Sequence, residues 1–340
     1  MTEYTINQTV QKDFHSKADW NNSLMQFEGQ NIFQSYEWGE LKEYSGWKTL
    51  RVVINNSITL RTILLAQVLV KNYFGIKVAW CPGGPLINSE NDIEIEEAVS
   101  KFQEIIFDNK IINLRCNPYI SSNSQYKKNF DIFIKPNVSI TSPKSIILNV
   151  EDEKDFLPKL RRKHRYYVTQ SRKHDITWSI SSGKEASEIF FGVYKDMMSN
   201  KSLRLPVINI EKLSNLLGNT PDGHPRLFTF SGMDDNNIVS ASVISIFNDQ
   251  AFYHYAASNS HGRKIFASYD MVVSLINILN SMGVKKMDFG GLSQSESKEG
   301  VDFFKQGFNG DLFEKVGEFD VTKLKLYSFM FSKMLKFMNS

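Results

Sequence analysis

The sequence lacks several features that would indicate other classes of protein. Only two of its 340 residues are cysteines, Cys81 and Cys116, too few for a disulfide framework or a thiolate metal site. The six histidines show no HxxxH or HxH spacing, and no metal is expected. No run of about 18 uncharged apolar residues occurs, and the amino-terminal stretch is polar, without the apolar core of a signal peptide. A cytoplasmic protein without a membrane span is therefore expected.

Charge is nearly balanced overall but concentrated locally. The net charge of +3 is too small to predict a nucleic-acid partner by itself. In the segment 155–174, however, no acid follows Asp155, and we expect one helix whose buried face carries Phe156, Leu160, Tyr167 and Val168. Seven cations lie on this segment: Lys159, Arg161, Arg162, Lys163, Arg165, Arg172 and Lys173. The pattern fits either a solvated helix face or a surface that binds the phosphates of RNA or of a nucleotide-linked substrate.

The same order of predicted elements occurs twice in the chain. Each copy has a strand, a tight turn, two more strands, a helix and a closing strand. The first copy spans 50–54, 60–70, 77–81, a helix near 95–106, and 111–115; the second spans 227–230, 239–247, 251–257, a helix at 269–282, and 284–289. A helix before the last strand requires a parallel crossover. The sequence therefore predicts an α/β protein with two mixed sheets of the acyltransferase type.

The most unusual local chemistry follows the last predicted strand of the second copy. This strand ends at Gly290-Gly291, where the backbone can turn sharply and a ligand can approach closely. After a polar loop, Phe303 and Phe304 precede Lys305, so the ammonium is set among aromatic rings. Either Lys305 lies in a closed cleft, or its stem only covers packed phenylalanines while its charge stays in water.

Two further basic segments are notable. Arg263 and Lys264 form a loop just before the second predicted helix, where an anion is favoured. The stretch 321–340 interleaves apolar residues with lysines and has no acids. It fits a terminal helix packed on a domain, or a helix on a membrane surface.

Several short motifs, spread over nearly the whole chain, together resemble the FemABX family of non-ribosomal peptidyltransferases. They are Gln34-Ser35-x-x-Trp38, Leu160-Arg161-x-x-x-Arg165-Tyr166, Tyr255-Ala256-Ala257-Ser258, Tyr269, Asp288-Phe289-Gly290-Gly291 and Phe304-Lys305-x-x-Phe308. The resemblance implies two tandem acetyltransferase-like (GNAT-like) domains, here 1–150 with 321–340 and 151–320. No heptad segment occurs, so the chain resembles the compact members without a coiled-coil arm.

The resemblance also implies a reaction and its residues. Aminoacyl-tRNA is the expected donor and a nucleotide-linked or lipid-linked cell-envelope precursor the acceptor, with no cofactor and with peripheral membrane contact left open. Lys305 is the expected catalytic residue, with Phe304 beside it. The expected substrate-binding residues are Lys42, Arg115, Arg204, Tyr255, Tyr269, Asp288, Gly290 and Gly291. The expected RNA-binding or phosphate-binding residues are Arg161, Arg162, Arg165, Arg263 and Lys264.

The chain departs from the family pattern at three positions, and two other functions remain open. Glu40 stands nearest the family's lysine position with Lys42 two residues on, Arg204 is one residue out of register, and Asn117 replaces an aspartate. One alternative is an acyl-CoA or acyl-carrier N-acyltransferase, although the segment HGRKIFASYD has one glycine where coenzyme A enzymes have a glycine-rich loop. The other is a non-catalytic binding module on the same fold.

Overall fold

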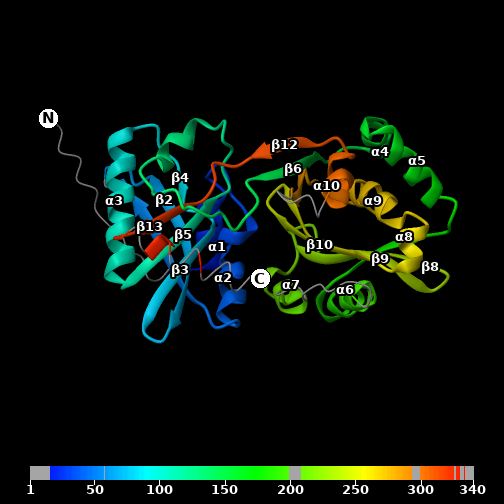
Figure 1. Ribbon diagram of the computed structural model, residues 1–340, viewed down its shortest axis with the longest axis horizontal. Coiled ribbons are helices and arrows are strands. Elements are labelled where there is room, and N and C mark those ends of the chain that lie inside the picture. Colours follow the sequence, from blue (N-terminus) through cyan, green and yellow to red (C-terminus); the bar gives the residue numbers. More distant parts are fainter. Residues whose placement is uncertain are drawn as a thin grey trace. The chain divides into compact units, whose positions relative to one another are not determined.

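The computed structural model describes residues 16–56, 58–198, 208–292, 299–324, 327–329 and 333. Contacts divide the chain into two units, Met1–Pro143 with Glu314–Ser340, and Lys144–Phe313. Each unit has one mixed sheet with helices on both faces (Figure 1). The predicted fold class, α/β with two mixed sheets of the acyltransferase type, is confirmed.

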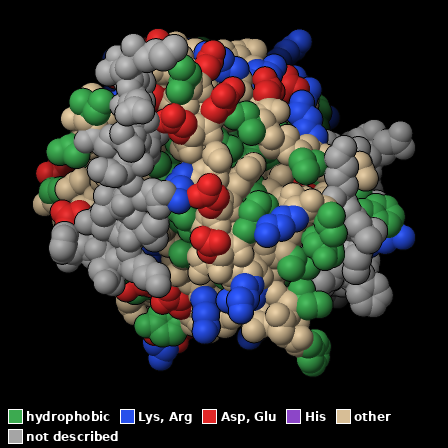
Figure 2. Space-filling view, turned by 90° about the vertical axis from the view of Figure 1, so that its left-hand side faces the viewer, with side chains coloured by type: hydrophobic (Ala, Val, Ile, Leu, Met, Phe, Trp, Pro, Cys, Tyr) green, Lys and Arg blue, Asp and Glu red, His purple; other side chains and the backbone are tan. Residues whose placement is uncertain are grey.

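The first unit is built on the sheet β1-β2-β3-β5-β13, with β4 paired to β2. Its strands are β1 (Lys48–Asn55), β2 (Thr62–Tyr73), β3 (Ile76–Gly83), β4 (Leu86–Ile87), β5 (Ile111–Pro118) and β13 (Phe319–Thr322). Its helices are α1 (Lys17–Leu24), η1 (Ile32–Gln34), α2 (Tyr36–Glu43), α3 (Asp92–Asp108) and η2 (Gln125–Phe130). Helix α3 covers one face and α2 the other (Figure 1). Figure 2 shows this unit from the side of α3, where acidic and basic side chains are interspersed rather than gathered by sign.

The second unit is built on the sheet β12-β6-β11-β10-β9-β8-β7. Its strands are β6 (Lys144–Asn149), β7 (Thr177–Ser181), β8 (Leu227–Asp234), β9 (Asn237–Phe247), β10 (Gln250–Ser258), β11 (Lys286–Gly291) and β12 (Asp311–Glu314). Its helices are α4 (Glu153–Phe156), η3 (Leu157–Lys159), α5 (Arg162–Ser171), α6 (Gly183–Met198), α7 (Ile210–Leu217), α8 (Ser260–Lys264), α9 (Ala267–Ser281) and α10 (Glu299–Gln306). Helices α6 and α7 cover one face, and α5, α9 and α10 lie on the other (Figure 1).

Central strands such as β2 have continuous apolar sequences because both of their faces are buried. In β2, every residue from Ile63 to Leu69 is buried, because helices cover both faces of the sheet. In α3, the buried residues Ile95, Val99, Phe102 and Ile106 recur at helical spacing and face the sheet. The crossover helix of each unit thus joins two parallel strands, β3 to β5 and β10 to β11.

Three elements differ from the sequence-based expectation. Strand β6 belongs to the second sheet, where it pairs with β11, so the first unit ends at Pro143 rather than at residue 150. Strand β13 returns to the first sheet beside β5, so the return to the first unit begins at Glu314 rather than at residue 321. Val321 lies in this strand rather than in a helix, and most of the predicted terminal helix lies outside the described residues.

The predicted basic helix is interrupted. Its first part forms the short helices α4 and η3. Leu160 and Arg161 are then extended, and α5 begins at Arg162. Pro158 stands inside this break, as expected for a residue without a backbone N–H. The guanidinium of Arg165 donates to the carbonyls of Pro158 and Leu160, which satisfies acceptors that a continuous helix would have used.

Candidate active site

The candidate site lies where the parallel strands β10 and β11 part. The two strands pair at only three positions, ending at Phe252 opposite Asp288. Beyond that point β10 carries a bulge between Tyr253 and Tyr255, where its register with β9 shifts. In the first unit the corresponding strands β3 and β5 pair at seven positions, along almost their whole length. A ligand can enter a sheet where parallel strands separate at their carboxyl ends. The strands separate in this way in the second unit and stay paired in the first, so the candidate site lies in the second unit.

A pocket of about 550 Å³ occupies this opening. It is lined by Met197, Tyr253, His254, Tyr255, Ala256, Ala257, Ser258, Arg263, Ser268, Tyr269, Phe289, Gly290, Gly291, Gly300, Val301, Phe304 and Lys305. The lining combines aromatic rings with a few polar groups, which is typical of small-ligand sites. It brings together six predicted site residues from β10, β11, α9 and α10, together with Arg263.

Lys305 lies in the last turn of α10 and is half-buried. Its Nζ donates to the carbonyl oxygen of Gly291 at 2.7 Å. Gly290 has φ +87°, and a Cβ there would lie 3.1 Å from the same Nζ, so the glycine permits both the turn and the approach of the lysine. The ammonium is therefore held in the wall of the pocket.

Asp288 shapes this turn and does not line the pocket. Its Oδ1 accepts a hydrogen bond from the backbone N–H of Gly290 at 2.8 Å, and Ser145 Oγ lies 3.5 Å from Oδ2. The carboxylate is 6% exposed. Asp288 was predicted to bind substrate. In the structure its carboxylate instead stabilises the Gly290-Gly291 turn beside the pocket.

Aromatic rings surround the stem of Lys305. The ring centroid of Phe304 lies 5.0 Å from Tyr269, 5.1 Å from Phe308 and 5.8 Å from Phe289. Burial, followed by the neighbouring Tyr167, raises the pKa of Tyr269. A hydroxyl with a raised pKa stays protonated at neutral pH and can donate a hydrogen bond.

Two more tyrosines of β10 share this behaviour. Burial raises the pKa of Tyr253, and burial followed by Tyr194 raises the pKa of Tyr255. The pocket therefore offers neutral hydroxyls beside its cations. Arg263 lines the pocket and donates to the carbonyl of Ser258 at 2.6 Å, whereas Lys264 is exposed and outside the lining.

Two predicted substrate-binding residues, Lys42 and Arg115, belong to the first unit, and a third, Arg204, is outside the described residues. Lys42 is half-buried on α2 in the first unit, with Nζ 4.9 Å from the ring centroid of Trp38, and burial lowers its pKa. Arg115 is buried in the first unit.

The prediction that Arg115 binds substrate is wrong for this structure. Its side chain is 0% exposed and donates to Asp320 at 2.5 Å and to Glu318 at 2.8 Å. Burial alone would lower the pKa of Arg115, but these two carboxylates raise it above its usual value. Asp320 lies on β13, next to β5, so the guanidinium ties the returning strand to the first sheet.

Two cations of the basic segment are neutralised by acids. Lys159 pairs with Glu151 at 2.5 Å. Arg172 pairs with Glu153 at 2.7 Å and with Asp270 at 2.6 Å, and these partners raise its pKa. Neither side chain is available as an unpaired charge for phosphate.

The three predicted RNA-binding arginines of this segment are all exposed but differ in their hydrogen bonds. Arg165 is held by the carbonyls of Pro158 and Leu160. Arg161 and Arg162 are exposed, and within the described part of the chain neither side chain makes an ion pair. Of the predicted RNA-binding residues on this segment, Arg161 and Arg162 keep their guanidinium groups exposed, whereas part of the Arg165 guanidinium is used in bonds to two carbonyls.

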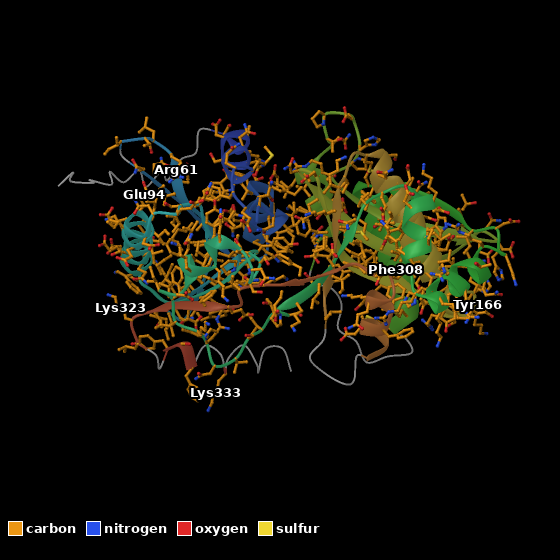
Figure 3. The ribbon with its side chains drawn as sticks, turned by 90° about the horizontal axis from the view of Figure 1, so that it is seen from above. Arg61, Glu94, Tyr166, Phe308, Lys323 and Lys333 are labelled. Atoms are coloured by element: carbon orange, nitrogen blue, oxygen red, sulfur yellow. The ribbon has the colours of Figure 1, made fainter. Side chains whose placement is uncertain are left out.

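Two residues of α5 were not among the predicted site residues, although one of them, Tyr166, stands in a quoted motif. Tyr166 is 57% exposed beside these arginines, and Figure 3 shows it on the outer side of the unit, whereas Phe308 lies inside. His164 is 0% exposed, and its Nε2 lies 3.0 Å from the carbonyl oxygen of Phe304. Helical spacing within α5 places His164 on the same face as the buried Val168, and this spacing could have identified it.

The parted strands, the bulge in β10 and the repeat of one unit define a protein of two acetyltransferase-like domains. Residues 228–336 match the model of the FemAB family. This match agrees with the resemblance to the FemABX family that the motifs of this segment indicate. The matched segment includes β8 to β11, α9 and α10, and so contains most of the pocket.

Solved structures with the same fold cover nearly the whole chain. "Crystal structure of FemX" has 15% identity and a TM-score of 0.78, covering 93% of this chain and 98% of that chain. L-PGS from Bacillus licheniformis has 10% identity and a TM-score of 0.57, with 97% and 98% covered. A tandem GNAT protein from the clavulanic acid biosynthesis pathway has 9% identity and a TM-score of 0.52, with 93% and 97% covered. At these identities the likeness establishes the fold. No curated protein sequence matches the chain.

Proposed function

We propose that this protein is an aminoacyltransferase that moves an aminoacyl group from aminoacyl-tRNA to an amine of a peptidoglycan or surface-glycan precursor. The observation that carries the proposal is the position of Lys305 in the pocket between β10 and β11, within the segment that matches the FemAB family. We expect the reaction in the cytoplasm, where charged tRNA is available, including at the inner face of the membrane. Among the described residues, no helix is long and apolar enough to cross a bilayer.

The chemistry assigned to the pocket is direct aminolysis of an ester. The acceptor nitrogen attacks the ester carbonyl carbon, a new C–N bond forms, and the C–O bond to the ribose breaks. The proton that the amine loses goes to the leaving ribose oxygen, so atoms and charge balance. The ammonium of Lys305 stabilises the negative charge that develops on the carbonyl oxygen. The neutral hydroxyls of Tyr255 and Tyr269 are proposed to orient the donor group.

The surface of α5 supports RNA as the donor carrier. Arg161 and Arg162 present unpaired charge to solvent, and Tyr166 presents an exposed ring beside them. Cations that bind phosphate together with an aromatic ring that stacks on a base are the usual elements of RNA contact. The backbone N–H of Arg161 donates to the carbonyl of Gly307 at 2.9 Å, just after α10, so this surface begins beside the helix that carries Lys305.

Coenzyme A is disfavoured as the donor carrier by the surroundings of Gly262. This glycine is buried, and a Cβ there would lie 2.1 Å from the carbonyl oxygen of Val239. Its N–H already donates to Asn259 Oδ1 at 2.7 Å. Because the glycine packs against β9 and its amide is used, the loop does not present it to a pyrophosphate.

The acceptor is assigned by its chemical class. Among the fold relatives, one is named a putative lysylphosphatidylglycerol synthetase, with a TM-score of 0.57. A cell-envelope precursor carries an amine and a diphosphate, and we propose Lys42 and Arg204 as contacts to the anionic part. Lys42 has a lowered pKa because it is half-buried, and an anion bound there would restore a preference for the charged form.

The decisive experiment is single-turnover transfer with wild type and Lys305→Met. Methionine keeps much of the stem and removes the ammonium, so the protein should fold while the rate falls by about 100-fold or more, the scale of one lost oxyanion stabiliser. Lys305→Arg keeps the charge but not its compact geometry and should rescue only in part. Donors are aminoacyl-tRNA and an acyl thioester, offered separately with a nucleotide-linked muropeptide.

Each outcome of this experiment separates the proposed functions. Transfer from the thioester alone would replace the tRNA assignment with the N-acyltransferase alternative. Binding of tRNA without transfer from either donor would support a non-catalytic binding module. A folded Lys305→Met protein with a normal rate would refute the catalytic role of this lysine.

A further inference from the structure

His164 is a buried titratable residue that the proposed chemistry does not use. Its ring is 0% exposed and packs edge-on against Tyr269, at 5.0 Å between centroids, and against Phe308, at 5.2 Å. A buried imidazole normally needs a hydrogen-bond partner. The partner here is the backbone carbonyl of Phe304, whose oxygen lies 3.0 Å from Nε2.

This carbonyl lies in the last turn of α10, where the carbonyls of a helix have no N–H donor within the helix. The N–H of Gly307 goes to the carbonyl of Phe303 at 3.1 Å, and the N–H of Phe308 goes to the carbonyl of Lys305 at 3.4 Å. Neither amide is therefore directed at Phe304. The imidazole Nε2–H supplies the missing donor, and the same hydrogen bond selects the tautomer that carries its proton on Nε2.

The backbone after α10 is fitted to the ring. A Cβ at Gly307 would lie 1.8 Å from Cε1 of His164 and 1.9 Å from Nε2, so only glycine permits this approach. The carbonyl of Gly307 accepts from the N–H of Arg161 at 2.9 Å. Two hydrogen bonds thus join the start of α5 to the end of α10, one from the N–H of Arg161 and one from Nε2 of His164. The close contact between Gly307 and the His164 ring adds to them.

We propose that His164 is a positioning residue: by binding the Phe304 carbonyl it fixes the end of α10 and so holds the adjacent Lys305 in the pocket. This inference rests on the proposed function of Lys305. Burial, together with the cations Arg161 and Lys163, lowers the pKa of His164 even though the Phe304 carbonyl opposes the shift. The ring is therefore neutral at neutral pH, in agreement with a buried Nδ1 that has no hydrogen-bond partner among the described residues.

The test compares His164→Gln with His164→Leu in two backgrounds, wild type and Lys305→Met. The amide of glutamine can place a donor close to the position of Nε2, whereas leucine has similar bulk and no donor. In single-turnover transfer from aminoacyl-tRNA, His164→Leu should lower the rate at saturating donor by about 10- to 100-fold, since small displacements of a catalytic group carry such costs. His164→Gln should stay within about 3-fold of wild type, and the donor Kd should change little in both variants.

The second background separates positioning from general damage. If His164 acts through Lys305, then His164→Leu should have no further effect once Lys305 is methionine, because the two changes remove the same contribution. An equal loss in both backgrounds would overturn the proposal, and so would a normal rate for His164→Leu in the wild-type background. A normal rate for Lys305→Met would instead refute the function of the lysine on which the inference rests.

A measurement without activity keeps the proposal testable if transfer proves slow. Hydrogen–deuterium exchange of the full chain, followed by mass spectrometry of peptides covering 299–308, should be faster in His164→Leu and unchanged in His164→Gln. His164→Asn, whose amide is too short to reach Phe304, serves if the leucine variant does not fold, and it should behave like leucine. Equal exchange in the donor-lacking variant and in wild type would refute the assignment.

Discussion

The double substitution Arg161→Gln with Arg162→Gln tests the RNA surface most directly, because the structure separates unpaired cations from paired ones. Both arginines are exposed and make no ion pair within the described residues. Arg172, at the other end of α5, is paired with Glu153 and Asp270. Glutamine keeps polarity and removes charge, and both positions are exposed, so the fold should be unaffected.

The expected magnitude follows from counterion release. Each phosphate contact contributes about 0.7 to 0.9 to the slope of log K against log salt, so two lost contacts should lower the slope by about 1.4 to 1.8. Between 50 and 200 mM salt, this difference corresponds to about a 7- to 12-fold smaller change in Kd for the double variant than for wild type. The tRNA affinity of the double variant should be weaker at low salt and approach that of wild type at high salt.

The assay is fluorescence anisotropy of a labelled aminoacyl-tRNA titrated over that salt range. Arg165→Gln is the matched control on the same helix, because its guanidinium is bound to the carbonyls of Pro158 and Leu160. It should leave the slope unchanged although it also removes one positive charge from this helix. A slope that does not change for Arg161→Gln with Arg162→Gln would refute the reasoning and leave α5 as a solvated face.

Three further predictions concern other parts of the chain. Tyr166→Ala should weaken tRNA binding by about 1 to 3 kcal/mol without changing the salt slope, since stacking on a base releases no counterion, and the same anisotropy titration measures both quantities. Gly290→Ala should lower the transfer rate with little effect on tRNA affinity, because a Cβ at φ +87° strains the turn and approaches Lys305 Nζ at 3.1 Å; a wild-type single-turnover rate would contradict it. Arg115→Met should cost about 3 to 5 kcal/mol in the free energy of unfolding measured with urea, because it leaves Asp320 buried without its cation; a loss below about 1 kcal/mol would show that the carboxylates find other partners.

The repeated unit and its class could be predicted from the sequence because both depend on local patterns. Apolar runs bounded by turns marked the strands, and helical spacing in α3 marked the crossover. The Gly290-Gly291 turn and the aromatic residues before Lys305 are also local signals, and the structure places Gly290, Gly291, Phe304 and Lys305 in the lining of one pocket. These signals are carried by residues that are neighbours in the chain.

Only the tertiary structure decided which charges are used and where the sheet opens. Arg115 and Asp320 are 205 residues apart in the sequence, and no local pattern shows that one neutralises the other. His164 meets Phe304 across 140 residues, and the pairing of β10 with β11 stops after Phe252 although both strands continue. Periodicity records which face of an element is buried, but the partner of a buried polar group and the length of a ladder depend on how distant elements pack.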